Sequence, residues 1–234
     1  MHKINKQELS EADICDLFIT PAIKDAGWDQ MSQVRREVTL TPGPIVVRGN
    51  ISTRNQKKRK FADYVLSWVI GVPIAVVEAK SNKHSVSHGL QQALGYGEIL
   101  EVPSAFSSNG EAFAAHNKVP AAAEEIETQF PLDQFPPPQI LWQRYKLYRG
   151  IEEASEELVL QPYHSDSSGK EPRYYQVEAI NRVIEAVAKG QRRLLLVMAT
   201  GTGKTYTTFQ IIWRLWKAKA VRRVLFLVDR NILA

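Results

Sequence analysis

The sequence predicts an α/β protein made of a strand-and-helix domain followed by the beginning of a second, parallel-sheet domain. Two observations indicate this. In the first half of the chain, short apolar runs of strand length alternate with helical stretches. Further along, the unbroken apolar runs Leu194–Val197 and Val224–Val228 enclose a glycine-rich loop and a helical segment. Strands buried on both faces of a parallel sheet have this unbroken apolar character.

The first domain is predicted to open with a helix. Ser10–Asp13 has the form of a capping box, and Gly27 suits the end of that helix. The elements expected after it are strands at Val38–Leu40 and Ile45–Val47, strands at Phe61–Ile70 and Pro73–Val77 joined by a turn at Gly71, a helix from about Val86 to Leu100, and a hairpin at Ala105–His116 turning at Asn109–Gly110.

Two breaks divide the rest of the chain. Pro136–Pro138 interrupts regular structure, and Ser165–Gly169 is a polar, turn-rich stretch that suits a linker. We therefore expect one domain over residues 1–155, a linker over 156–169 and a truncated second domain over 170–234.

Composition sets broad limits on function. The formal charge of +5 and the pI near 9.2 permit a phosphate-rich partner without requiring one. The single cysteine, Cys15, cannot form an internal disulfide, which is typical of a reducing compartment. The sequence has neither a signal peptide nor an apolar stretch of membrane-spanning length. We expect a cytoplasmic protein with no membrane partner.

The loop Thr200–Thr205 lies where the apolar run Leu194–Val197 leads into a helix. Glycines let such a backbone fold tightly, so that its amides and the helix N-terminus surround phosphate oxygens. Lys204 would reach the β- and γ-phosphates of ATP, and the Thr205 hydroxyl would bind Mg²⁺. The alternative is a simple glycine turn with an exposed lysine, and Met198 departs from the small residue of the full consensus.

A second motif stands about 25 residues upstream, at Arg173–Gln176. Together the two motifs resemble the start of superfamily 2 helicases and translocases, in which the glutamine recognises adenine, although alone Gln176 would be read as a surface residue. Val224–Asp229 resembles the next motif, which contacts the nucleic-acid backbone. The predicted nucleotide-binding residues are Gln176, Gly201, Thr202, Gly203, Lys204 and Thr205. The acidic box that such motors need does not occur in this sequence, so we expect at most nucleotide binding, and no turnover.

A carboxylate cluster is predicted in the first domain. If the apolar runs on either side of Gly71 form a hairpin, residues whose numbers sum to 141 face each other, and Asp63 opposes Glu78 at about 5 Å between Cβ atoms. Lys80 lies on the same face. Like charges so placed favour a divalent cation between them, and Mg²⁺ accepts such a shell. The alternative is an exposed Asp63 and an exposed Glu78–Lys80 pair. A one-residue slip in register would turn these side chains to opposite faces of the sheet.

Asp63 followed by Glu78–Lys80 at the end of an apolar strand resembles the PD-(D/E)xK nuclease fold, a mixed sheet flanked by helices, with Ala62 in place of the proline. Gln92 and Tyr96 match a Gln-x-x-x-Tyr helix of that fold, which helps to position DNA and the active site; their i, i+4 spacing places them on one helical face. Glu11 matches an acidic position that often completes the metal site. An acid favoured by the helix dipole is an equal alternative for Glu11.

Two further groups flank the predicted site. The basic residues Arg54 and Lys57–Lys60 lead into the Asp63 strand, where DNA backbone must approach, although charge runs are usually solvated loops. His84 and His88 follow Lys80, and the favoured interpretation is that both are surface histidines rather than general bases.

The order nuclease then motor resembles the restriction (R) subunit of Type I restriction–modification enzymes; Type III restriction subunits have the same parts in the opposite order. The resemblance implies a subunit that binds modification (methyltransferase) and specificity subunits, pumps double-stranded DNA with ATP and cuts it with Mg²⁺. Two alternatives stay open: another nuclease–helicase fusion, as in DNA repair, and a degenerate nuclease domain that only binds DNA or a partner.

Overall fold

A computed structural model describes residues 5–41, 45–48, 51–54, 60–120, 124–165, 169 and 172–227 of the chain. It divides into two compact units, Met1–Gly150 and Ile151–Ala234. The predicted bounds of the two domains and their linker stay a prediction. None of the helices among the described residues is both long enough and apolar enough to cross a membrane.

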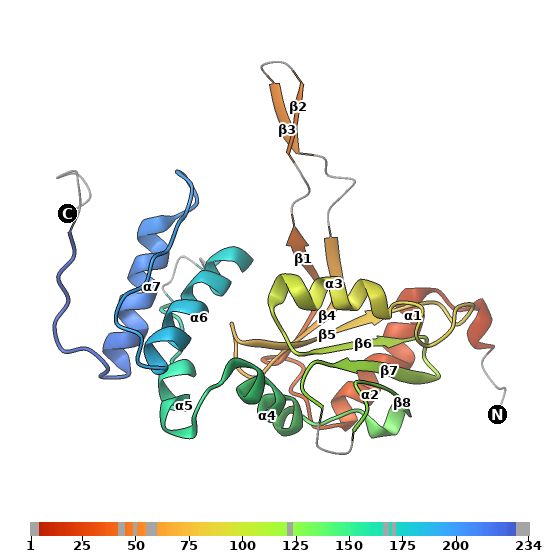
Figure 1. The fold of residues 1–234 in the computed structure, drawn as a ribbon. Helices are drawn as coiled ribbons and strands as arrows, with labels where there is room; N and C mark the ends of the chain where they lie inside the picture. The colour runs from red at the N-terminus through yellow and green to blue at the C-terminus, as the bar shows by residue number, and fades with distance from the viewer. Residues whose placement is uncertain are drawn as a thin grey trace. The chain divides into compact units, whose positions relative to one another are not determined.

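The first unit is built on a six-stranded mixed sheet, as predicted (Figure 1). Its strands, in spatial order, are β1 (Val34–Thr41), β4 (Lys60–Ser67), β5 (Pro73–Ala79), β6 (Ser104–Ser108), β7 (Ala112–Asn117) and β8 (Glu127–Pro131). All neighbours are antiparallel except β5 and β6, which run parallel and are joined through helix α3 (Leu90–Leu100). β2 (Ile45–Arg48) and β3 (Ile51–Arg54) form a separate antiparallel pair.

The predicted first helix is present, and it contains a π-helical turn. Ser10 and Asp13 form the expected capping box, with the Ser10 backbone N–H donating to the Asp13 carboxylate at 2.9 Å. The helical elements of this unit are η1 (Lys6–Glu8), α1 (Glu11–Ile14), the π-helical turn η2 (Cys15–Ile19), α2 (Thr20–Asp25), α3, η4 (Leu132–Gln134) and α4 (Pro138–Arg149).

Helix α3 closes one hydrophobic core against the sheet. Ala93 and Tyr96 pack with buried side chains of the neighbouring strands, among them Val65, Val76 and Ala105. The predicted start of this helix was wrong: it begins at Leu90 and not near Val86, because residues 86–89 form a turn whose last amide is bonded to the sheet rather than to the helix.

The hairpin of β6 and β7 is confirmed. Its strands pair antiparallel, and Gly110 takes a left-handed φ of 81° at the turn. A side chain at this position would also meet Ile14, since a Cβ would lie 3.1 Å from it. The turn therefore needs glycine both for its backbone and for its contact with the first helix.

The second unit packs α5 (Glu153–Val159), α6 (Tyr174–Ala188) and α7 (Lys204–Lys217) together. Arg214 is fully buried and donates to the Asn181 side chain at 2.8 Å and to the Val159 carbonyl oxygen. The side-chain amide of Gln210 makes two hydrogen bonds to the backbone of His164. Helix α7 is therefore hydrogen-bonded to α5, to α6 and to His164.

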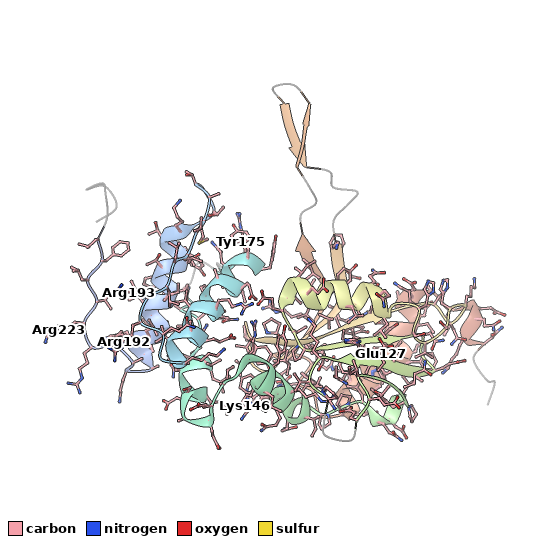
Figure 2. All side chains as sticks on the ribbon, in the orientation of Figure 1. Glu127, Lys146, Tyr175, Arg192, Arg193 and Arg223 are labelled. Carbon is pink, nitrogen blue, oxygen red and sulfur yellow. The ribbon has the colours of Figure 1, made fainter. Side chains whose placement is uncertain are left out.

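The two strands predicted in this unit were wrong. Residues 191–199 and 223–227 are not strands, and nothing described in this unit pairs with them. Leu195 and Leu225 are 90% and 82% exposed. An apolar run becomes a strand only when a neighbouring strand satisfies its backbone groups, and no described residue supplies one. Figure 2 shows three exposed arginines on these segments, Arg192, Arg193 and Arg223.

Candidate nuclease site and phosphate loop

The predicted register of the β4–β5 hairpin is confirmed. Tyr64 faces Val77 and Val65 faces Val76, so that the paired residue numbers sum to 141. Asp63 and Glu78 are the next position of the same ladder and share one face of the sheet. Asp63 Oδ2 also accepts a hydrogen bond from the Ala79 backbone N–H at 2.7 Å. The irregularity in this ladder lies at its other end, between Leu66 and Ser67.

Glu78 has a buried carboxyl group, of which one oxygen accepts a hydrogen bond and the other has no hydrogen-bond partner in the described structure. It is 2% exposed, and Oε1 accepts a hydrogen bond from Lys80 Nζ at 2.6 Å. Within the described structure, Oε2 is buried and has no hydrogen-bond partner. Burial raises the pKa of Glu78 to about 7; the Asp63 charge also raises it, while the bond from Lys80 lowers it. Glu78 is therefore an acid whose ionised form needs more positive charge than Lys80 supplies.

Asp63 and Lys80 share this electrostatic environment. Burial raises the pKa of Asp63, whereas the Ala79 N–H and the charge of Lys80 lower it. Burial by itself would lower the pKa of Lys80, but its bond to Glu78 and the surrounding carboxylates raise it overall. Glu11, exposed on the first turn of α1, raises the pKa values of both Asp63 and Lys80. Its carboxylate therefore lies within electrostatic range of the cluster.

Gln92 and Tyr96 meet on α3 as their spacing predicts. Gln92 Nε2 donates to the Tyr96 hydroxyl at 2.6 Å. Burial raises the pKa of Tyr96, the bond from Gln92 lowers it, and the charges of Glu78 and Asp63 raise it further. The phenol therefore lies close enough to both carboxylates to respond to their charge. The structure thus brings Asp63, Glu78 and Lys80 together and pairs Gln92 with Tyr96 beside them. Glu11 lies within electrostatic range of this cluster, but it does not join Asp63 and Glu78 in a group of three metal-binding carboxylates.

Sequence reasoning missed Gly89 and Ser107. The Gly89 N–H donates to Ser107 Oγ at 3.1 Å, and Ser107 pairs with Glu78 in the parallel β5–β6 ladder. A Cβ on Gly89 would lie 2.8 Å from Ser107 Oγ, 3.0 Å from Glu78 Cγ and 3.2 Å from Lys80 Cγ. These contacts link segments far apart in the chain, and no local pattern marks them.

The cluster fits a hard divalent cation better than a transition metal. No group of three or more His, Cys, Asp or Glu side chains that could hold a metal occurs in the described ranges. Mg²⁺ commonly takes one or two carboxylates and completes its shell with water. The unpartnered Oε2 of Glu78, beside Asp63, is the kind of oxygen that such a cation would satisfy.

The phosphate loop of the second unit is intact at the start of α7. Gly201 and Gly203 both have left-handed φ angles, of 79° and 84°, and Gly203 is the N-cap of the helix. Lys204 Nζ folds back over the loop to the carbonyl oxygens of Met198 at 3.3 Å and Ala199 at 3.4 Å. The free backbone amides of a helix N-terminus with a lysine above them form an anion site. Thr205 lies exposed on the first turn.

Gln176 joins the upstream motif to this loop. Its Nε2 donates to the Thr202 carbonyl oxygen at 3.0 Å, and its Oε1 accepts from the Arg173 N–H at 2.9 Å. A Cβ on Gly203 would lie 2.4 Å from Gln176 Nε2, so a side chain there would displace the Gln176 amide from the loop. A cavity of about 310 Å³ is lined by Arg173, Tyr175, Gln176, Gly201, Thr202, Gly203 and Tyr206.

Two predicted features cannot be placed. The side chain of Arg54 and residues 57–59 of the basic run lie outside the described part of the chain, and only Lys60, exposed at the start of β4, is seen. Residues 228–229, the end of the predicted motif Val224–Asp229, also lie outside the described part of the chain. Their roles stay predictions.

Known proteins match the chain along its length. It is 51% identical to the Type I restriction enzyme EcoAI endonuclease subunit of Escherichia coli, over 100% of this chain and 28% of that protein. The chain belongs to the endonuclease subunits of Type I restriction enzymes. The EcoKI endonuclease subunit of E. coli strain K12 is 29% identical over 92% of the chain and 22% of its own length. The chain therefore spans about a quarter of the length of the curated relatives that it matches.

A solved structure and a family model agree with this. A fragment assigned to the HsdR subunit of a type I restriction enzyme from Vibrio vulnificus YJ016 matches with a TM-score of 0.75 and 39% identity, over 90% of this chain and 39% of that one. Residues 169–234 match the family described as "Type III restriction enzyme, res subunit". That match covers only part of the second unit, whereas the two Type I subunits match 100% and 92% of the chain.

Proposed function

We propose that this chain cuts double-stranded DNA in a Mg²⁺-dependent reaction, as the nuclease part of a Type I restriction subunit that translocates DNA with ATP. The observation that supports this most is the Asp63–Glu78–Lys80 cluster. Its buried, unpartnered Glu78 Oε2 stands beside a second carboxylate and a lysine. A purely structural ion pair would not need the third charged group or leave one oxygen unsatisfied.

Asp63 and Glu78 would hold the cation. When bound, Mg²⁺ supplies Lewis-acid polarisation of a phosphodiester and compensates the charge of the transition state. Lys80, which bonds to Glu78 in this structure, would orient the attacking water or neutralise developing charge with its ammonium group. Gln92 and Tyr96 would position the DNA strand from α3, and Glu11 would complete the acidic shell.

The second unit would bind ATP with Mg²⁺. The loop amides and Lys204 would receive the phosphates, Thr205 would contribute its hydroxyl to Mg²⁺, and Gln176 would read adenine at the edge of the same cavity. In the complete subunit this site would drive translocation, and the modification and specificity subunits would select the DNA. Dependence on a methylation-sensitive recognition complex separates this function from that of a DNA-repair nuclease–helicase.

The test uses two lysine variants of the full-length subunit, assembled with its partner subunits. Lys80→Ala should abolish DNA cleavage and leave ATP hydrolysis unchanged, whereas Lys204→Ala should abolish hydrolysis. Mg²⁺ or Mn²⁺ titration of wild type and Asp63→Ala should show weaker binding in the variant. Equal metal binding by both proteins, or cleavage by Lys80→Ala at the wild-type rate, would refute the nuclease assignment.

A further inference from the structure

An exposed loop borders the proposed nuclease site on one side. This loop, residues 81–88, is called the rim loop below. It starts next to Lys80, which bonds to Glu78, and it ends next to Gly89, whose Cα faces the side chains of Glu78 and Lys80. Both ends of the rim loop are therefore attached to the cluster itself.

The rim loop carries hydrogen-bond donors and no acid. Its sequence is Ser-Asn-Lys-His-Ser-Val-Ser-His, and five of its polar residues are exposed: Lys83, His84, Ser85, Ser87 and His88. The chain has 25 acidic residues in 234, about one in nine, yet none occurs between Glu78 and Glu98. A surface beside two carboxylates that offers a lysine, two histidines and serine hydroxyls but no acid suits a polyanion rather than a cation or an acidic-and-basic protein surface.

The rim loop is also held in shape. Asn82 Nδ2 donates to the Asn109 carbonyl oxygen at 3.1 Å, and Asn109 Nδ2 donates to the His84 carbonyl oxygen at 2.8 Å. Asn109, in the turn between β6 and β7, is thus hydrogen-bonded to the rim loop at two positions, Asn82 and His84. His84 and His88 stack with ring centroids 4.2 Å apart and planes inclined by 13°.

The stacked arrangement of His84 and His88 favours phosphate binding over metal chelation. The nitrogens of two stacked, nearly parallel rings lie in separate planes, so their lone pairs do not converge on one ion and the pair is poorly arranged to chelate a metal. The N–H groups of two such rings can instead meet successive oxygens of a phosphodiester backbone.

We propose that the rim loop binds the phosphodiester backbone of the DNA strand at the nuclease site, through Lys83, His84 and His88. The proposal rests on the proposed nuclease function and adds to it a surface that sets the position of the scissile strand. Because bonds of Asn82 and Asn109 hold the first half of the loop, little ordering of its backbone there accompanies binding.

The test compares Lys83→Ala/His84→Ala/His88→Ala with wild type in the full-length subunit assembled with its partners. The matched control is Lys24→Ala/His116→Ala, which removes a lysine and a histidine elsewhere in the same unit. Cleavage and ATP hydrolysis are measured from low to moderate salt. The triple variant should cleave about tenfold more slowly or worse, as expected when charge-assisted hydrogen bonds are lost, with ATP hydrolysis within twofold of wild type. Loss of the Lys83 contact should make log cleavage rate against log salt shallower by about one.

Proximity is tested separately by His88→p-benzoylphenylalanine, which should photo-crosslink to DNA in the stalled enzyme, whereas Lys24→p-benzoylphenylalanine should not.

Wild-type cleavage by the triple variant, an unchanged salt slope, or no crosslink would overturn the proposal. Loss of subunit assembly would instead assign the loop to a protein interface. If the triple variant fails to fold, the salt dependence of cleavage by Lys83→Ala alone decides: an unchanged slope overturns the proposal. DNA cleavage by Asp63→Ala would refute the nuclease function itself. If Asp63→Ala is inactive and the triple variant cleaves at the wild-type rate, only the rim-loop proposal is refuted.

Discussion

The Tyr64 hydroxyl donates a hydrogen bond to the Cys15 carbonyl oxygen at 3.3 Å, inside the π-helical turn that follows α1. The same hydroxyl lies 2.9 Å from Thr20 Oγ1, and Tyr64 is fully buried. Tyr64 is the neighbour of Asp63 in β4, and the π-helical turn directly follows the helix that carries Glu11. One buried hydroxyl therefore ties the strand holding Asp63 to the helix holding Glu11.

Removing that hydroxyl should weaken the fold and the metal site together. Tyr64→Phe keeps the ring and leaves the Thr20 hydroxyl without this partner, so we expect a loss of about 1–2 kcal/mol in the free energy of unfolding. Mg²⁺ affinity should fall several-fold because Glu11 is less well held. Urea unfolding and metal titration measure the two effects. Thr20→Val removes the same bond from the other side and should add little to Tyr64→Phe; full additivity in a double-mutant cycle would show that no bond couples them.

Gly89→Ala should impair the nuclease site, because its Cβ would be forced against Ser107 and the side chains of Glu78 and Lys80. We expect a destabilisation of about 1–3 kcal/mol together with slower cleavage. Gly95→Ala is the matched control on the same helix, since a Cβ there meets nothing within 4 Å. It should be neutral or stabilise by about 0.5–1 kcal/mol. Equal effects of the two variants would mean that Gly89 is not tightly packed.

Gly203→Ala should weaken nucleotide binding more than it weakens the fold. The new methyl would displace Gln176 from Thr202, in addition to the strain of an alanine at a φ of 84°. Gly190→Ala carries a similar strain, with φ at 78° and nothing within 4 Å of its Cβ. Fluorescent ATP-analogue binding should separate them, with affinity reduced at least tenfold for Gly203→Ala and unchanged for Gly190→Ala. Identical affinities would refute the packing of Gln176 on this loop.

The stability of the metal-free protein should fall as pH rises. Burial raises the pKa of Glu78 from 4.5 to about 7, so folding favours its protonated form. Below pH 4.5 this carboxyl group is protonated in both states and costs nothing; above pH 7 the folded state must ionise a buried group. The cost is roughly 3 kcal/mol when fully developed. Unfolding measured in EDTA from pH 5 to pH 8 should show this loss, and Glu78→Gln should remove the trend. Saturating Mg²⁺ should restore stability at pH 8, and a wild-type profile parallel to that of Glu78→Gln would contradict the assignment.

Local chemistry accounts for what could be predicted from the chain alone. The register of β4 and β5 follows from the short turn at Gly71 and the two-residue period of strands, and these two features suffice to place Asp63, Glu78 and Lys80 on one face of the sheet. The i, i+4 period likewise places Gln92 with Tyr96. Each of these relations spans few residues, so loop length and side-chain period define it.

Only the tertiary structure decided the rest. The contact of Gly89 with Ser107 joins the end of the rim loop to a strand beyond the crossover helix, and the bond from Tyr64 to Cys15 joins segments 49 residues apart. Leu194–Val197 and Val224–Val228 show the converse: their apolar runs predicted strands, but no described strand lies beside them. The sequence by itself determined which side chains form the Asp63–Glu78–Lys80 cluster and the glycine-rich loop before α7. Packing between distant segments determined how tightly the cluster is held and which apolar runs become strands, because those outcomes depend on partners that no local pattern specifies.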